Sequence, residues 1–179
     1  MINNPIELIC TKERLRDAIR TVPNFPKEGV LFRDIMPLLR AYFNETLESM
    51  SSLIETYDWE NIDFIAGIES RGFILAAGLA ARKNKGLIPI RKPGKLPGDV
   101  LCVDYKLEYG TDALEMAKGS GRLLLVDDVL ATGGTLQAAA SLAEKAAYHI
   151  QNILVLINLK SLNSFEWNGM IPKSVFDYE

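Results

Sequence analysis

One stretch of the sequence could hold an anion beside two carboxylates. The apolar run 123–126 ends at Asp127 and Asp128, and a loop of small residues then leads into an Ala-rich segment. Small residues let backbone amides approach a ligand closely, and a helix N-terminus adds about half a positive charge there. Carboxylates accept hydrogen bonds from vicinal hydroxyls, so the combination favours a ribose 5-phosphate. The residues expected to surround the phosphate are Ala131, Thr132, Gly133, Gly134 and Thr135.

Other phosphate motifs do not match this stretch. No Lys followed by Ser or Thr comes after the glycines, as a Walker loop requires, and the glycines lack the Gly-x-Gly-x-x-Gly spacing. A simple turn with a helix cap would explain residues 132–135 alone. It would not explain the apolar strand and the acidic pair that precede them.

Two further segments carry cations that could bind a second anion. Ser70 and Arg71 follow another apolar run, and the guanidinium fork of Arg binds phosphate oxygens in pairs. Arg91, Lys92 and Lys95 lie within five residues, in a stretch rich in proline and glycine. Alone, these segments would be an ordinary turn and a solvated basic loop. Beside a phosphate site they suggest pyrophosphate binding under a loop that closes, expected over residues 91–110.

Strands and helices alternate around these segments. Continuous apolar strands separated by helices indicate an α/β fold with a mainly parallel twisted sheet and helices on both faces. Ligands of such folds bind at the carboxyl ends of the strands, where the segments above are expected. We expect strands at 62–68, 87–90, 123–126 and 153–157, and helices at 72–83 and 136–148. Before them we expect a helix from Ile9 to Val22 and a second one capped by Asn44 and extending to Tyr57.

Composition narrows the class of protein. The chain has 179 residues, 48% of them hydrophobic, which suits one globular domain, and its net charge of −3 argues against a nucleic-acid partner. Cys10 and Cys102 form neither a metal spacing nor a disulfide framework, so Cys102 is interpreted as packing. His149, the only histidine, is expected to be structural or at the surface. The longest apolar stretch, 73–81, is about half a membrane span, so we expect a cytoplasmic protein with no membrane partner.

The order of the motifs resembles that of the adenine phosphoribosyltransferases, a branch of the type I phosphoribosyltransferases. The similarity runs from Phe25 to Leu162. It is carried by Phe32–Asp34, Glu69–Gly72, Arg91–Gly98, Leu107–Gly110 and residues 123–135. The resemblance implies transfer of the 5-phosphoribosyl group from 5-phosphoribosyl 1-pyrophosphate (PRPP) to adenine, giving AMP and pyrophosphate. It also implies Mg²⁺ carried by PRPP rather than by the protein, and a homodimer.

The resemblance further implies a role for each matching residue. Residues 1–179 would form one domain, with a small base-binding hood built from about 1–40 and 159–179. Asp127 and Asp128 would hold the ribose hydroxyls, and a cis Glu69–Ser70 peptide would lie at the pyrophosphate. Arg91 would reach the pyrophosphate of the neighbouring subunit. Adenine would contact Leu31, Phe32, Arg33 and Leu159, while Glu108 would manage the proton of the purine and Tyr109 would assist closure.

Three alternatives stay open at this point. The same fold could transfer the phosphoribosyl group to hypoxanthine, guanine or orotate, since few contacts select the base. A regulator could keep the fold as a PRPP sensor, although this sequence shows no added DNA-binding domain or basic surface. A flavodoxin-like or dinucleotide-binding protein is disfavoured by the acidic pair directly before the small-residue loop.

Overall fold

The computed structural model describes residues 12–107 and 110–179, which fall into two compact units. The first unit ends at Ser51 and the second begins at Ser52. Residues 12–17 of the first unit are helical. They are followed by β1 (Arg20–Pro23), β2 (Leu31–Asp34) and α2 (Met36–Ser51). β1 and β2 pair antiparallel, and an ion pair between Arg20 and Asp34 (2.6 Å) joins their far ends.

The sequence predictions for the first unit were partly wrong. Val22 is not in a helix but in β1, where it pairs with Phe32, because β-branched residues favour a pleated strand. α2 begins after Asp34, whose Oδ1 accepts the Met36 N–H at 2.9 Å. It is kinked at Tyr42, whose φ of −139° and ψ of 42° are not helical, so its second part begins near Asn44 but without Asn44 as its cap. Tyr57 belongs to a separate short helix, α3 (Thr56–Glu60), and its side chain is exposed.

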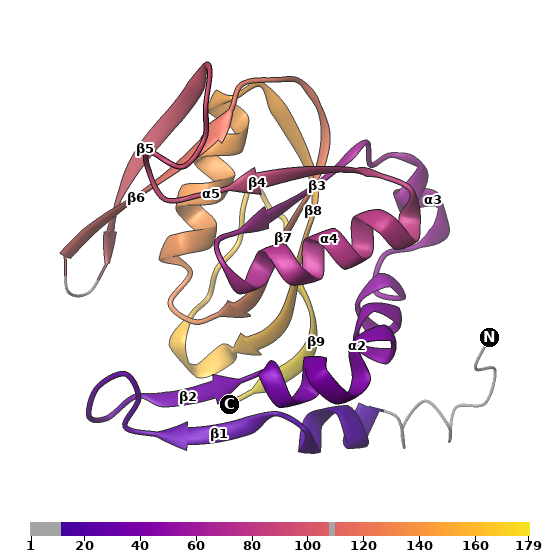
Figure 1. Cartoon of the computed structure of the whole chain (residues 1–179), viewed down its shortest axis with the longest axis vertical. Helices are drawn as coiled ribbons and strands as arrows, with labels where there is room; N and C mark the ends of the chain where they lie inside the picture. Colours follow the sequence, from indigo (N-terminus) through magenta and orange to yellow (C-terminus); the bar gives the residue numbers. More distant parts are fainter. Residues whose placement is uncertain (1–11, 108–109) are drawn as a thin grey trace. The chain divides into compact units, whose positions relative to one another are not determined.

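The second unit is built on a five-stranded parallel sheet. Its strand order is β4-β3-β7-β8-β9, and every neighbouring pair runs parallel. The strands are β3 (Phe64–Ile68), β4 (Gly86–Ile90), β7 (Gly121–Leu130), β8 (Tyr148–Leu159) and β9 (Lys173–Tyr178). The connecting helices are α4 (Arg71–Lys83), between β3 and β4, and α5 (Gly134–Lys145), between β7 and β8; a short 3-10 helix, η1 (Lys160–Leu162), follows β8 (Figure 1). The expected fold class is confirmed.

Helices cover both faces of this sheet. Alternate strand residues such as Ala66, Leu125 and Val155 share one buried cluster with the Ala-rich face of α5. The intervening residues, among them Ile65 and Leu124, are equally buried and point to the opposite face, against which α4 packs. The sheet therefore lies between two apolar layers, as parallel sheets require. Among the residues described, no helix is long and apolar enough to cross a membrane.

An antiparallel hairpin interrupts the α/β alternation. It consists of β5 (Val100–Leu107) and β6 (Gly110–Ala117), paired so that Leu101 faces Met116, and it packs against α5. The sequence predicts only a loop over 91–110, so the part from Val100 onward is a correction. The physical reason is cross-strand burial: Leu114 and Met116 are almost fully buried. The proline- and glycine-rich part, residues 91–99, is irregular apart from one bridge at Arg91.

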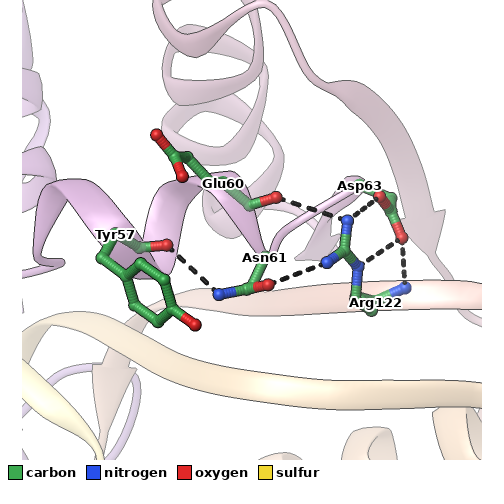
Figure 2. Close-up of polar contacts among 5 residues, drawn as sticks. All are labelled: Tyr57, Glu60, Asn61, Asp63 and Arg122. Atoms are coloured by element: carbon green, nitrogen blue, oxygen red, sulfur yellow. Dashed lines mark hydrogen bonds and ion pairs between the residues drawn. The ribbon is translucent and has the colours of Figure 1, made fainter.

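A closed polar cluster joins β3 and β7 where both strands begin. Arg122 donates from Nη2 to Asp63 Oδ1 (2.7 Å) and from Nε to Asp63 Oδ2 (3.0 Å). Its Nη1 donates to Asn61 Oδ1 (2.9 Å), and the Asn61 amide donates to the Tyr57 carbonyl (3.3 Å) (Figure 2). The hydrogen bonds from Arg122 hold the pKa of Asp63 far below its usual range. The amino edge of the sheet, the side where its parallel strands begin, thus presents paired charges.

Candidate functional site

The sheet has a topological switch point between β3 and β7. From β3 the chain crosses outward to β4, and from β7 it crosses the other way to β8 (Figure 1). The two strands are in register, with Gly67 beside Val126, so their carboxyl ends meet. Such a point leaves a crevice between the diverging connections, where α/β proteins bind ligands. Ser70 and Arg71 follow β3 there, and the acidic pair lies near the end of β7.

The small-residue loop encloses a pocket. The pocket has a volume of about 60 Å³ and is lined by residues 129–136, which include the five residues predicted to surround a phosphate. Gly133 is the N-cap of α5 and has a φ of 88°, a left-handed conformation that L side chains rarely adopt. A Cβ at Gly133 would also lie 3.0 Å from the Phe165 ring. Backbone amides and the positive end of a twelve-residue helix therefore face one small hollow.

Asp127 and Asp128 are buried side by side. Only 7% and 6% of their surfaces are exposed. Burial is the main cause that raises the pKa of both carboxyl groups, and for Asp127 the neighbouring Asp128 charge adds to it. Arg71 opposes the shift, since its Nε lies 2.8 Å from Asp128 Oδ2. Two buried carboxylates with one guanidinium leave a negative site that hydroxyl donors would stabilise. The sequence places both residues after the strand, whereas β7 continues to Leu130.

The start of α4 fits closely against the end of β7. A Cβ at Gly72 would lie 2.9 Å from Asp127 Oδ1 and 3.1 Å from the Val126 carbonyl oxygen, so only glycine lets the helix approach this far. Ser70 is the N-cap of α4, and the Glu69–Ser70 peptide is cis, as the resemblance implies. The structure thus brings Ser70 and Arg71 next to the acidic pair.

The cationic loop, residues 91–98, is fixed by carboxylates. Arg91 Nε lies 3.3 Å from Glu69 Oε2, which also accepts the Lys92 N–H at 3.0 Å. This backbone hydrogen bond is the main cause that lowers the pKa of Glu69. Lys92 Nζ pairs with Asp112 of β6 at 3.0 Å, which raises the pKa of the lysine. Within the described part of the chain, Lys95 forms no ion pair.

Sequence reasoning missed two residues that connect the hairpin to these loops. Glu115 of β6 is 4% exposed and accepts three backbone N–H groups of the cationic loop. Tyr105 of β5 lies near Thr135 of the phosphate loop, which acts to lower its pKa, while burial is the main cause that raises it. The only signal for Glu115 was a charged residue within the otherwise apolar run 113–117. Nothing in the sequence indicated Tyr105.

The residues expected to contact a base belong to both units. Leu31, Phe32 and Arg33 form β2 of the first unit, where Leu31 is half exposed and Phe25 meets the Phe32 ring edge-on at 5.0 Å. Leu159 ends β8 of the second unit and is half-buried. Their convergence on one base stays a prediction.

Several other predictions can be placed in the structure. Glu108 and Tyr109, expected to act in catalysis and closure, lie outside the described residues. Cys102 is exposed on β5, so its interpretation as a packing residue was wrong: alternate residues of a hairpin face solvent. His149 is exposed, as expected. The described residues contain no group of three or more His, Cys, Asp or Glu side chains that could hold a metal ion.

Comparisons with known proteins agree on one family. Residues 41–161 match the phosphoribosyl transferase domain. The chain is 47% identical over 166 residues to the adenine phosphoribosyltransferase of Hydrogenovibrio crunogenus, covering 92% of this chain and 96% of that protein. The crystal structure of adenine phosphoribosyltransferase from Thermoanaerobacter pseudethanolicus superposes with a TM-score of 0.83 at 38% identity, covering 93% and 99% of the two chains. The Saccharomyces cerevisiae adenine phosphoribosyltransferase, solved with adenine and an imino-altritol bisphosphate, gives 0.81 at 32% identity, covering 93% and 97%.

Proposed function

Since the chain belongs to the adenine phosphoribosyltransferase branch of the phosphoribosyl transferase family, we propose that its switch-point crevice binds PRPP for transfer of the phosphoribosyl group to adenine. The products are AMP and pyrophosphate. The observation that carries the proposal is the buried acidic pair directly beside the small-residue pocket. A phosphate bound in the pocket and a diol bound at the carboxylates would together be the ribose 5-phosphate part of PRPP.

The protein would contribute mainly by holding the donor. The amides and hydroxyls of residues 131–135 would bind the 5-phosphate, and Asp127 and Asp128 would accept hydrogen bonds from the ribose hydroxyls. These donated hydrogen bonds would stabilise carboxylates that are costly to ionise in the empty protein. Because C1 of the ribose gains positive charge as pyrophosphate leaves, the reaction benefits from fixed geometry and from cations at the leaving group.

Cations for the leaving group come from two segments. We assign the pyrophosphate to Ser70, Arg71 and the loop residues Arg91, Lys92 and Lys95. Arg91 and Lys92 already have acidic partners, so among the residues that the structure describes Lys95 is the loop cation without an ion pair. Mg²⁺ is treated as part of the substrate, bound to PRPP oxygens, since this ion keeps several waters and needs few protein ligands. The donor set fits this assignment, because one oxygen of each aspartate already has a protein partner, Arg71 for Asp128 and the Asp128 N–H for Asp127, and the ribose hydroxyls would take the remaining acceptor sites.

Adenine would stack on Phe32, with backbone groups of Leu31 at its edge, Arg33 alongside and Leu159 on the other face. Aromatic stacking of a base is worth about 1–3 kcal/mol, which suits a planar substrate. Glu108 would manage the proton of the purine during attack, and Tyr109 would assist closure. We also propose a homodimer in which Arg91 serves the neighbouring subunit, and a cytoplasmic location; light scattering in solution tests the dimer.

The decisive experiment supplies PRPP and Mg²⁺ with adenine, hypoxanthine, guanine or orotate in turn, and measures nucleotide monophosphate. We expect AMP from adenine and no product from the other bases. Turnover of a different base would keep the donor site but overturn the assignment of Phe32 and Leu159 to adenine. Binding of PRPP without any turnover would favour the sensor alternative.

A further inference from the structure

We propose that Glu115 is a positioning residue for PRPP: by binding the backbone of the cationic loop, it holds Lys95 in place for the diphosphate of the donor. The inference rests on the proposed function and adds a residue that lies outside every motif of the resemblance. Glu115 belongs to β6, whereas the loop that it holds precedes β5.

Three consecutive amides of the loop converge on the Glu115 carboxylate. Gly94 N–H donates to Oε2 at 2.8 Å, and Lys95 and Leu96 N–H donate to Oε1 at 2.7 and 2.6 Å. Gly94 has a φ of 79°, the left-handed conformation that lets successive amides turn toward one anion. The loop therefore wraps around a carboxylate supplied by the protein itself.

The carboxylate is itself held in a fixed position. Its neighbours on β6, Leu114 and Met116, are 2% and 0% exposed, so the strand is anchored in the core at this point. The backbone of Glu115 also exchanges two hydrogen bonds with Arg91, of 2.9 and 2.7 Å, at the start of the loop. Glu115 thus holds both the first residue of the cationic loop and the turn at residues 94–96.

The charge distribution keeps Lys95 available. Burial acts to raise the pKa of Glu115, but the three loop amides outweigh it and lower the pKa, so the group is charged at neutral pH. Its charge is satisfied mainly by neutral N–H groups rather than by a lysine ammonium. Lys95 therefore takes its backbone position from Glu115 while its ammonium forms no ion pair among the described residues. A buried carboxylate would repel a diphosphate, so Glu115 acts through the loop and does not bind the donor.

Glu115→Gln tests the proposal, because the amide keeps the shape of the side chain but places an N–H₂ group where an acceptor is needed. We expect the KM for PRPP to rise about tenfold, as loss of a hydrogen bond to a charged group suggests. The kcat and the KM for adenine should change less than twofold. The matched control is Asp99→Asn, which removes an exposed ion pair with Lys118 (2.9 Å) at the other end of the same irregular segment and should leave all three constants unchanged.

Two additional measurements separate positioning from a general structural role. Amide exchange of Gly94, Lys95 and Leu96 should be faster in Glu115→Gln, with the sheet unchanged. In a Lys95→Met background, Glu115→Gln should add less than twofold to the KM for PRPP. Gly94→Ala disturbs the amide turn from the exposed side of the loop and should reproduce the rise in KM even if Glu115→Gln does not fold. An unchanged KM for PRPP in both variants, equal rises for both substrates, or full additivity with Lys95→Met would overturn the proposal.

Failure of the Glu115 proposal can be distinguished from failure of the proposed function. If the wild-type protein forms no AMP from adenine, the function proposed above is wrong. Calorimetric titration of PRPP then replaces KM, and a dissociation constant that is the same for wild type and Glu115→Gln would overturn the role of Glu115 independently.

Discussion

The aspartates at the two ends of the parallel strands, the amino edge and the carboxyl edge of the sheet, have opposite pKa shifts. At the amino edge, Asp63 is half exposed and receives hydrogen bonds from Arg122, which hold its pKa far below the usual range. At the carboxyl edge, Asp127 and Asp128 are buried together and burial raises the pKa of both. Arg122 and the acidic pair lie on the same ten-residue strand, β7.

This difference indicates which edge is built for stability and which for a ligand. The charges at the amino edge are already paired within the protein and need no ligand to stabilise them. Buried carboxylates with one guanidinium are costly in the empty protein, and such strain concentrates at functional sites. We therefore expect that neutralising an aspartate has opposite effects at the two edges, and the following experiments test this from the largest expected effect to the smallest.

The largest effect should be on turnover. Asp127→Asn should lower kcat/KM for PRPP about 100-fold, since a neutral amide accepts weaker hydrogen bonds from the ribose hydroxyls than a carboxylate does. Asp63→Asn, the same change at the other end of the sheet, should leave kcat/KM within twofold. Steady-state kinetics with adenine in excess measures both. Equal losses in the two variants would remove the distinction between the edges.

A smaller effect is expected at the phosphate loop. Gly133→Ala should raise the KM for PRPP about tenfold and lower stability by about 1–2 kcal/mol, because alanine is strained at positive φ and its Cβ would meet Phe165. Gly169→Ala is the matched control, since Gly169 also has positive φ but a Cβ there would meet no described atom within 4 Å apart from its chain neighbours. Thermal unfolding and kinetics of both variants should show similar backbone strain but a changed KM only for Gly133→Ala.

The smallest effect is the pH dependence of stability, with opposite signs at the two edges. Because the pKa of Asp127 is raised in the folded protein, the protonated carboxyl group does not destabilise the fold but the ionised group does. This destabilisation develops as pH rises from about 4, the pKa in the unfolded chain, through the pKa in the folded protein. The Tm advantage of Asp127→Asn should therefore grow toward pH 8. A lowered pKa means that Asp63 stabilises the fold above about pH 4 and loses this contribution at lower pH, so the Tm deficit of Asp63→Asn should shrink there.

Thermal unfolding of the three proteins between pH 3 and pH 8 measures these differences. The changes should be on the order of 2–4 °C for the buried residue and smaller for the exposed pair. The same sign for both variants across this range would contradict the electrostatic contrast.

Four of the five sheet strands, the crossing helices and the phosphate loop could be predicted from sequence because each depends on local pattern, whereas β9 was not predicted. The apolar run 123–126 and the glycines at 133 and 134 are sufficient for a strand, a turn and a helix start. The hairpin could not be predicted, because its stability comes from burying Leu114 and Met116 against α5, far along the chain. For the same reason Glu115 looked like an ordinary charge, since its three amide partners lie about 20 residues away. The predicted helix boundary was wrong where pairing with another strand determines the structure, as at Val22 of β1.

The most direct test of the central claim is thermal unfolding of wild type and Asp127→Asn, each without ligand and with saturating AMP. We predict that the order reverses: the variant unfolds at the higher temperature when empty, because a buried charge is gone, and the wild type unfolds at the higher temperature with AMP, because its carboxylates bind the ribose. An equal rise in Tm with AMP in both proteins would show that the acidic pair does not hold the ribose and would contradict the claim.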